Sequence, residues 1–228
     1  MIMNTCYVCL KWGTKYSAEY VNKLAAMIRR WDPRDIPIYC YTDDPTGINC
    51  DIINLLPIGN QEDLETWWWK LPLLSNPVLK QYDRKILFDL DVIIHNDLRV
   101  LDNIQNDGLT VCQSYWKDPN ILKDKYEKNT LFNSSVMIWN NSDSIYEYFN
   151  KDPDRYMTIY KGIDRFLWHE KQPVHVLPEG IVYSYRRGSS LNDQEPYKFR
   201  EEYTICLFHQ YPKQADLLDN TFVKEHWQ

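Results

Sequence analysis

The chain has 228 residues, of which 44% are apolar and 25% are charged, a composition typical of a globular protein. Its formal net charge is −6 and no basic run is longer than Arg186-Arg187, which argues against nucleic acid as a partner. No apolar stretch approaches the roughly 18 residues of a membrane span, and the first residues lack the pattern of a signal peptide.

Cysteines and glycines limit the class of protein further. The six cysteines lie mostly in apolar, strand-like runs, and the Cys6/Cys9 spacing has no second pair that would complete a zinc site. We therefore predict six buried, reduced thiols and a cytoplasmic location. The seven glycines form no glycine-rich phosphate loop, so any nucleotide must be bound in another way.

Strands and helices alternate in the first part of the chain. A strand opens it, and the next segment carries its apolar residues on one helical face. We predict strands over 4–10, 36–42 and 51–56, and helices over 18–31 and 62–75.

Two carboxylates, Asp89 and Asp91, interrupt the apolar run from Ile86 to Ile94. The run predicts a strand buried on both faces, in which both side chains point to one side. Two adjacent carboxylates raise each other's pKa unless a cation lies between them, and oxygen ligands suit Mn²⁺ or Mg²⁺. The pair predicts a metal site; the alternative is a pair that faces water. Asp152-Pro153-Asp154 repeats the spacing in a polar stretch, and we interpret it as a solvated turn.

The second part of the chain is less regular. We predict one α/β domain over residues 1–228, because no repeat or linker-like segment marks a boundary. The predicted strands cover 109–115, 132–140, 174–177 and 204–208, and the predicted helices cover 142–149 and 160–170.

Several further residues suit a binding site. His209 directly follows an apolar strand and Lys213 comes four residues later, so they could bind a metal and a phosphate, or be an ordinary capping histidine and a solvated lysine. Three successive tryptophans, 67–69, precede Lys70; at most two can face one core, which leaves one as a surface or lid residue or as a support for a sugar or base. Asn133 and Asp164 each stand at the start of an apolar segment. Asn133 could be a turn residue or bind a sugar hydroxyl, and Asp164 could be a solvated helix-start residue or an active-site carboxylate.

This ordered set resembles the GT-A-fold nucleotide-sugar glycosyltransferases, in particular the family that includes glycogenin and bacterial galactosyltransferases (glycosyltransferase family 8-like). The resemblance spans about residues 5–213. The resemblance is carried by these elements: the first strand-turn-helix with Tyr16, Trp69-Lys70-Leu71, Phe88-Asp89-Leu90-Asp91, Phe132-Asn133-Ser134-Ser135, Asp164-Arg165-Phe166-Leu167, and Phe208-His209 with Pro212-Lys213.

The resemblance implies a single GT-A-like α/β domain with a mixed central sheet flanked by helices. Its Rossmann-like, nucleotide-binding half would cover about 1–95, and its acceptor and catalytic half about 96–228. The implied activity is metal-dependent transfer of a sugar from a nucleotide-diphosphate sugar, UDP being favoured, to a hydroxyl acceptor with retention of configuration. The oligomeric state is not implied.

The resemblance also implies roles for individual residues. Mn²⁺, with Mg²⁺ as the alternative, would be held by Asp89, Asp91 and His209. Donor-binding residues would be Lys11, Trp12, Tyr16, Lys70, Asp89 and Lys213, and catalytic residues near the transferred sugar would be Asp164 and Asn133. Two departures from the family pattern are the Ile163 that precedes Asp164 and the missing glycine between His209 and Lys213.

Two other functions fit parts of the pattern. In a haloacid-dehalogenase-type phosphohydrolase Asp89 would be the nucleophile, but more than eighty residues precede the motif here, whereas that motif normally opens the first strand. The chain could also be a non-catalytic sugar-nucleotide or glycan-binding protein. For the acceptor side we predict an exposed Trp116 and the loop 117–130.

Overall fold

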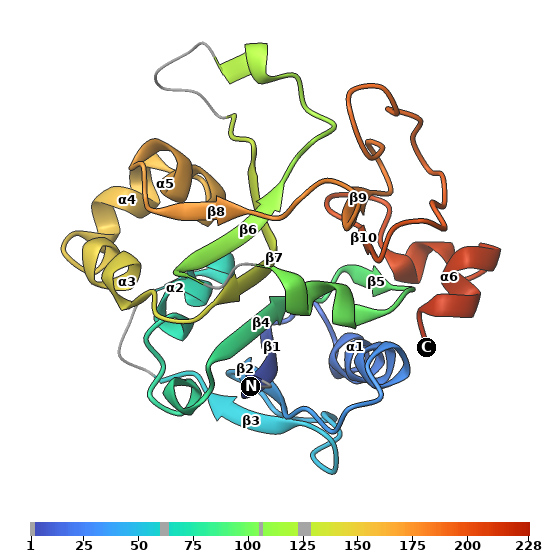
Figure 1. Cartoon of the computed structure of the whole chain (residues 1–228). Helices are drawn as coiled ribbons and strands as arrows, with labels where there is room; N and C mark the ends of the chain where they lie inside the picture. Colours follow the sequence, from blue (N-terminus) through green and yellow to red (C-terminus); the bar gives the residue numbers. More distant parts are fainter. Residues whose placement is uncertain (1–2, 60–63, 105–106, 123–128) are drawn as a thin grey trace.

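The computed structural model describes residues 3–59, 64–104, 107–122 and 129–228 (Figure 1). A seven-stranded sheet forms its centre, in the order β3-β2-β1-β4-β7-β6-β8. The first four of these strands are parallel; β7 is antiparallel to both of its neighbours, and β8 is parallel to β6. The strands are β1 (Thr5–Lys11), β2 (Ile38–Thr42), β3 (Asn54–Pro57), β4 (Arg84–Phe88), β6 (Leu109–Gln113), β7 (Phe132–Trp139) and β8 (Val174–Val176).

A second, three-stranded sheet lies beside the first. It joins β5 (Val92–Ile94) to β10 (Ile205–Leu207) and β10 to β9 (Val182–Ser184). Each sheet combines strands from before and after residue 95: β4 pairs with β7 in the large sheet, and β5 pairs with β10 in the small one. The division into a nucleotide-binding half and an acceptor half remains a prediction.

The helices cover both faces of the large sheet. None of the helices in the described ranges combines the length and the hydrophobicity of a membrane-spanning helix. The α-helices are α1 (Ala18–Trp31), α2 (Lys70–Leu73), α3 (Asp143–Phe149), α4 (Pro153–Ile159), α5 (Ile163–His169) and α6 (Thr221–His226). Short 3₁₀ helices cover Thr66–Trp69, Leu79–Gln81, Leu98–Asn103, Pro119–Leu122 and Gln214–Leu217.

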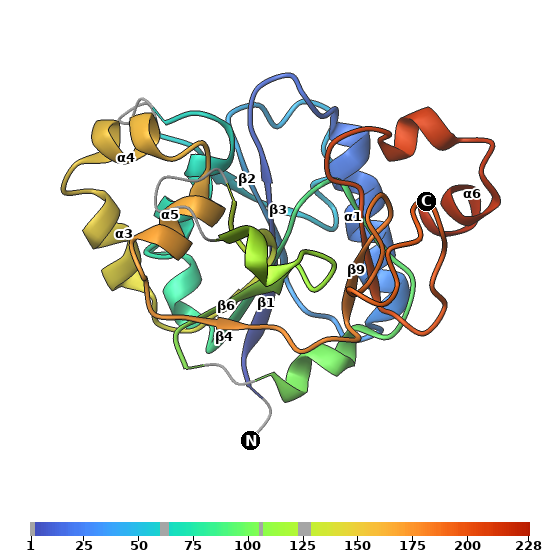
Figure 2. The ribbon, with the colours of Figure 1, turned by 90° about the horizontal axis from the view of Figure 1, so that it is seen from above.

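Alternate residues of the central strands belong to different cores. Tyr7 and Cys9 of β1 pack with α1 and the small sheet, whereas Cys6 and Val8 pack with α2 to α5. Figure 2 shows this arrangement, with α1, β9 and α6 on one side of β1 and α3, α4 and α5 on the other. Because strand side chains alternate between faces, the apolar runs of the sequence become a sheet buried on both sides. The predicted fold class, α/β with a mixed central sheet flanked by helices, is confirmed.

The predicted strand from Ile86 to Ile94 is wrong in one respect that matters for the site. β4 ends at Phe88, the chain turns at 89–91, and β5 begins at Val92 in the other sheet. Asp89 and Asp91 therefore lie in a turn rather than on one strand face. A turn at the end of the sheet keeps the two carboxylates out of its dry interior, where a charge is costly.

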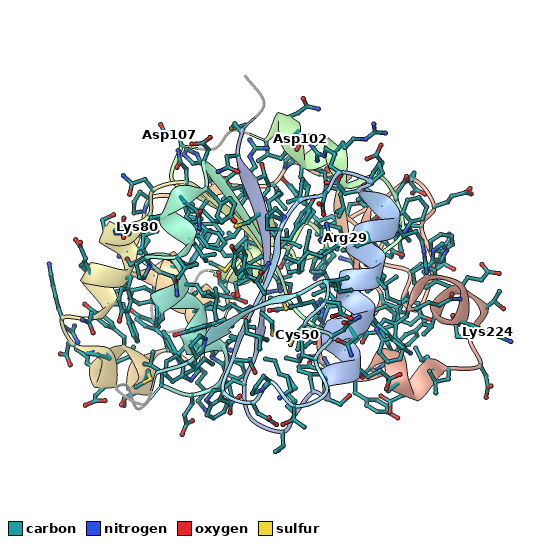
Figure 3. The ribbon with its side chains drawn as sticks, turned by 90° about the horizontal axis from the view of Figure 1, so that it is seen from below. Arg29, Cys50, Lys80, Asp102, Asp107 and Lys224 are labelled. Atoms are coloured by element: carbon teal, nitrogen blue, oxygen red, sulfur yellow. The ribbon has the colours of Figure 1, made fainter. Side chains whose placement is uncertain are left out.

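Three smaller predictions also need correction. Asp152-Pro153-Asp154 is not a free turn: Asp152 precedes α4 and Pro153 occupies its first position, where proline is favoured because its missing N–H would have no partner. Cys50 is an exposed thiol in the loop before β3 (Figure 3), while the other five cysteines are buried. Strand β9 and helix α6 were not predicted. Part of the helix predicted over 62–75 lies outside the described residues.

Candidate functional site

The candidate site lies where β1 and β4 end side by side. The two strands are parallel neighbours, so the segments that follow them meet at one edge of the sheet. β1 leads to Trp12 and Tyr16, and β4 leads to Asp89 and Asp91. The edge where parallel strands end is the usual place for a ligand in α/β folds.

Two pockets meet at this edge. The larger has a volume of about 510 Å³ and the smaller about 290 Å³. Asp89 and Asp91 line both, together with Lys15, Trp67 and Lys70. The two carboxylates therefore stand at the junction between the pockets.

Asp89 is compensated by a buried lysine. The Lys70 ammonium group lies 2.5 Å from an Asp89 carboxylate oxygen and also donates to the Ser134 carbonyl oxygen at 3.0 Å. The Asp89 N–H donates to the Ser135 carbonyl oxygen at 2.8 Å, which fixes the turn against β7. Burial raises the pKa of Asp89, the Lys70 charge opposes this effect, and the Asp91 charge adds to it.

Asp91 is held from two sides. Its carboxylate forms an ion pair with Lys213 and accepts a hydrogen bond from the Tyr16 hydroxyl at 2.8 Å. The Lys213 ammonium group also donates to the Phe208 carbonyl oxygen at 2.7 Å. Burial and the Asp91 charge raise the pKa of Tyr16, so Tyr16 remains a hydrogen-bond donor at neutral pH.

His209 lines the larger pocket and is held as a neutral ring. Burial lowers its pKa to about 4. Its Nε2 lies 3.0 Å from the Ser184 hydroxyl, and its ring stacks on Trp116 with centroids 5.7 Å apart. Its Nδ1 is buried and has no hydrogen-bond partner within the described part of the chain.

Asn133 and Asp164 both line the larger pocket. An Asp164 carboxylate oxygen accepts a hydrogen bond from the Ser134 N–H at 2.9 Å, and the Asn133 side-chain oxygen accepts one from the Ser135 N–H at 3.0 Å. Both side chains are thus oriented by the backbone of β7, at the start of which Asn133 lies. Their predicted catalytic roles remain predictions.

The aromatic candidates differ in exposure. Trp67 is 43% exposed and lines both pockets, whereas Trp68 and Trp69 are buried in the core, as the helical spacing predicts. Trp116 was expected to be exposed, and this is wrong: it is only 4% exposed because it packs under His209, although it still lines the larger pocket. Residues 123–128 of the predicted acceptor loop lie outside the described residues.

The predicted donor residues after β1 are not all equivalent. Trp12 and Tyr16 line the smaller pocket together with Leu10. Lys11 is buried, lines neither pocket and donates to the Asp44 carbonyl oxygen at 3.2 Å. Its predicted contact with the donor remains a prediction.

The residues predicted to hold a metal are present but are not assembled around one position. Among the described residues, no group of three His, Cys, Asp or Glu side chains is arranged for a metal. The donor chemistry nevertheless suits Mn²⁺ or Mg²⁺: two carboxylates at one junction and an imidazole nitrogen without a partner. The ammonium groups of Lys70 and Lys213 would compete with a metal for the two carboxylates.

Sequence reasoning missed a group of basic side chains around the site. Among the described residues, seven basic and three acidic side chains line the larger pocket, in a chain whose net charge is −6. The sequence named Arg165 within a motif, Lys117 at the start of the predicted acceptor loop and Arg187 in a basic pair, but it gave none of them a role; Ser184, the partner of His209, had no signal. The basic residues that the sequence did not single out for the site are Lys15, Lys117, Lys161, Arg165 and Arg187.

Solved structures with a similar fold include glycosyltransferases. The galactosyltransferase LgtC, solved with donor and acceptor sugar analogues, has 13% sequence identity and a TM-score of 0.61, with 91% of this chain and 88% of LgtC covered. GlyE of Streptococcus pneumoniae TIGR4 has 12% identity and a TM-score of 0.61, with 92% and 56% covered. The bifunctional WbbM has 10% identity and a TM-score of 0.58, with 94% and 47% covered.

These similarities are limited to the fold. The chain spans nearly all of LgtC but only about half the length of GlyE and WbbM. No protein-family model and no curated protein sequence matches the chain. The chain therefore has the fold of these GT-A-type glycosyltransferases, as its motifs predict.

Proposed function

We propose that the protein is a metal-dependent glycosyltransferase that moves a sugar from a nucleotide-diphosphate sugar, with UDP as the favoured nucleotide, to a hydroxyl acceptor. The observation that carries the proposal is the junction of the two pockets. There, two carboxylates and two lysines lie between an aromatic pocket and a polar one. A donor has the same order of parts: a flat base, a charged diphosphate and a polar sugar.

The smaller pocket suits the base and ribose. Leu10, Trp12 and Tyr16 supply apolar and aromatic surface, and base–aromatic contacts are favourable for any base. The diphosphate would then lie at the junction, within reach of Lys70 and Lys213. The larger pocket is left for the sugar and the acceptor.

The charges suit the departure of a nucleoside diphosphate. Breaking the bond between sugar and phosphate leaves negative charge on the phosphate oxygens. A divalent ion held by Asp89, Asp91 and His209 would supply a Lewis acid for that charge. Lys70 and Lys213 offer fixed positive charge at the same place, so that departure needs no proton donor from the protein.

Asp164 and Asn133 suit the reacting carbon of the sugar. Their side chains are held by backbone N–H groups of β7 and line the polar pocket. An oxygen near the anomeric carbon would stabilise the positive charge that develops there, by analogy with glycosidases. Retention of configuration belongs to the proposal through the family resemblance. A cytoplasmic location is also part of the proposal, and the six free thiols are consistent with it.

The test is the melting temperature with UDP, GDP and CDP, each with Mn²⁺, Mg²⁺ or EDTA. A ligand that binds only the folded state at about 100 times its dissociation constant stabilises it by ~2.7 kcal/mol. We expect one nucleotide to raise the melting temperature, with a loss of the effect in EDTA and in Asp91→Asn. Metal-dependent UDP binding retained by Asp91→Asn would refute the ligand assignment. Phosphate release from small phosphoesters without any nucleotide effect would favour the phosphohydrolase.

A further inference from the structure

Among the described residues, five basic side chains line the larger pocket and not the smaller one, and four of them remain when Lys213, which pairs with Asp91, is set aside. Lys117, Lys161, Arg165 and Arg187 are absent from the lining of the smaller pocket, which is where we place the base and ribose. They come from three separate segments: the connection after β6, the start of α5, and the connection after β9. Three distant parts of the chain thus bring positive charge to one place.

Within the described ranges, these charges do not take part in ion pairs that hold the fold together. None of the four forms an ion pair with a described carboxylate, although eight basic residues outside the pocket do so. The Lys117 ammonium group donates to the Thr130 carbonyl oxygen at 2.8 Å, which leaves two of its three donors for a ligand. Burial lowers the pKa of Lys117; the Asp164 charge opposes this effect, and the Arg187 and Arg165 charges add to it. Holding these cations together therefore has a cost that an anionic ligand would offset.

The donor diphosphate does not account for them. Lys70 and Lys213 already stand at the junction, beside the two carboxylates. Among the described residues, Asp164 is the only acidic one that lines the larger pocket alone, and its carboxylate accepts a hydrogen bond from the Ser134 N–H. The remaining part of the larger pocket is thus strongly cationic on the side where the acceptor would enter.

We propose that this cationic arm, defined as Lys117, Lys161, Arg165 and Arg187, binds an anionic acceptor: a glycan that carries a carboxylate or phosphate group near the hydroxyl that receives the sugar. The inference rests on the proposed function. A guanidinium group matches either oxyanion through paired N–H donors, and an ammonium group adds a point charge. A neutral sugar would leave these four cations with more positive charge than the single carboxylate of Asp164 balances.

The test measures binding of three probes by NMR titration to the protein saturated with UDP and Mn²⁺. The probes are methyl β-galactoside, the corresponding methyl galacturonide, and methyl β-galactoside 6-phosphate. We expect at least one acidic probe to bind about tenfold or more tightly than the neutral one. The tighter acidic probe identifies carboxylate or phosphate as the preferred group.

The double variant Arg165→Gln/Arg187→Gln should lose that preference, with acidic and neutral probes bound within about twofold of each other. Lys224→Gln is the matched control, because Lys224 is an exposed residue of α6 and lines neither pocket (Figure 3). The melting temperature of each variant checks that it is folded, and Lys117→Gln provides a second variant if the double one is not.

The outcomes separate this inference from the proposed function. UDP binding with equal affinity for neutral and acidic probes overturns the anionic acceptor alone and retains the transferase. A preference that survives in the double variant and in Lys117→Gln also overturns it, since the arm would not be its source. A protein that binds no nucleoside diphosphate overturns the proposed function, and the acceptor inference is withdrawn with it.

Discussion

Replacement of Lys213 by methionine should have opposite effects on metal binding and on nucleotide binding. In the ligand-free site the Lys213 ammonium group occupies Asp91, whose residue is only 8% exposed, and donates to the Phe208 carbonyl oxygen. A metal ion at Asp91 would compete with that ammonium group for the negative charge of the same carboxylate. When a diphosphate is present, the same group is free to turn to the phosphate oxygens.

The size of the effect follows from the interaction that is removed. A hydrogen bond to a charged group contributes about 1.5–3 kcal/mol, and 1.4 kcal/mol is a factor of ten in affinity. Without nucleotide, Lys213→Met should therefore bind Mn²⁺ about 10- to 100-fold more tightly than the original chain. It should bind UDP in the presence of Mn²⁺ about tenfold or more weakly. In EDTA its melting temperature should fall, because the Asp91 carboxylate loses its counter-charge.

The assay is calorimetric titration of Mn²⁺ into the free protein and of UDP into the Mn²⁺-saturated protein. Lys15→Met is the matched control: Lys15 lines both pockets and lies over the Tyr16 ring at 4.8 Å, and it forms no ion pair within the described part of the chain. The control removes the same charge without freeing a carboxylate. Equal Mn²⁺ affinities of the two variants would show that Lys213 does not compete with the metal.

Three further predictions concern stability and the exposed tryptophan. Burial lowers the pKa of His95 to about 4, so the unfolded chain takes up the proton first and stability falls as the pH drops from about 6.5 to 4. In denaturant melts at several pH values, His95→Phe should reduce that loss of unfolding free energy by up to ~3 kcal/mol. A pH dependence of stability equal to that of the exposed control His175→Gln would contradict this. Gly188 and Gly180 both have positive φ, but of the two only Gly188 is placed so that a Cβ would overlap a neighbouring backbone carbonyl oxygen. In thermal melts, Gly188→Ala should therefore lose about 1–3 kcal/mol more stability than Gly180→Ala. Equal losses of stability would exclude the clash. Trp67→Ala should weaken binding of the nucleotide sugar by about tenfold in calorimetry, because an aromatic surface is lost, whereas Trp67→Phe should retain most of the affinity. Unchanged affinity in both variants would show that Trp67 does not contact the ligand.

The sequence predicted the layers of the fold well because its apolar pattern is dense. The runs from Ile86 to Phe88 and from Val136 to Trp139 are buried on both faces, as continuous apolar segments predict. Strand β9 was missed because Val182–Ser184 is too short to show a period. Helix α4 was missed because Asp152 and Pro153 are typical of turns as well as of helix starts.

The site was predicted less completely, because pairings between distant residues leave no local signal. Asp89 and Asp91 are adjacent in sequence, but their lysines come from residues 70 and 213. Neither ion pair can be read from spacing. The position of His209 after a strand was visible, whereas its contact with Ser184 depends on the pairing of β9 with β10.

Net charge was the least informative property for the ligand. A value of −6 correctly describes the whole surface, yet seven basic side chains meet three acidic ones in the larger pocket. An electrostatic field is set by charges within about a Debye length, which is ~8 Å at physiological salt, so distant acidic residues do little to cancel it. A chain can thus repel polyanions such as nucleic acid over its outside and still attract a small anion into one pocket. For this protein, the local sign of the pocket is therefore the better guide to donor and acceptor than the charge of the whole chain.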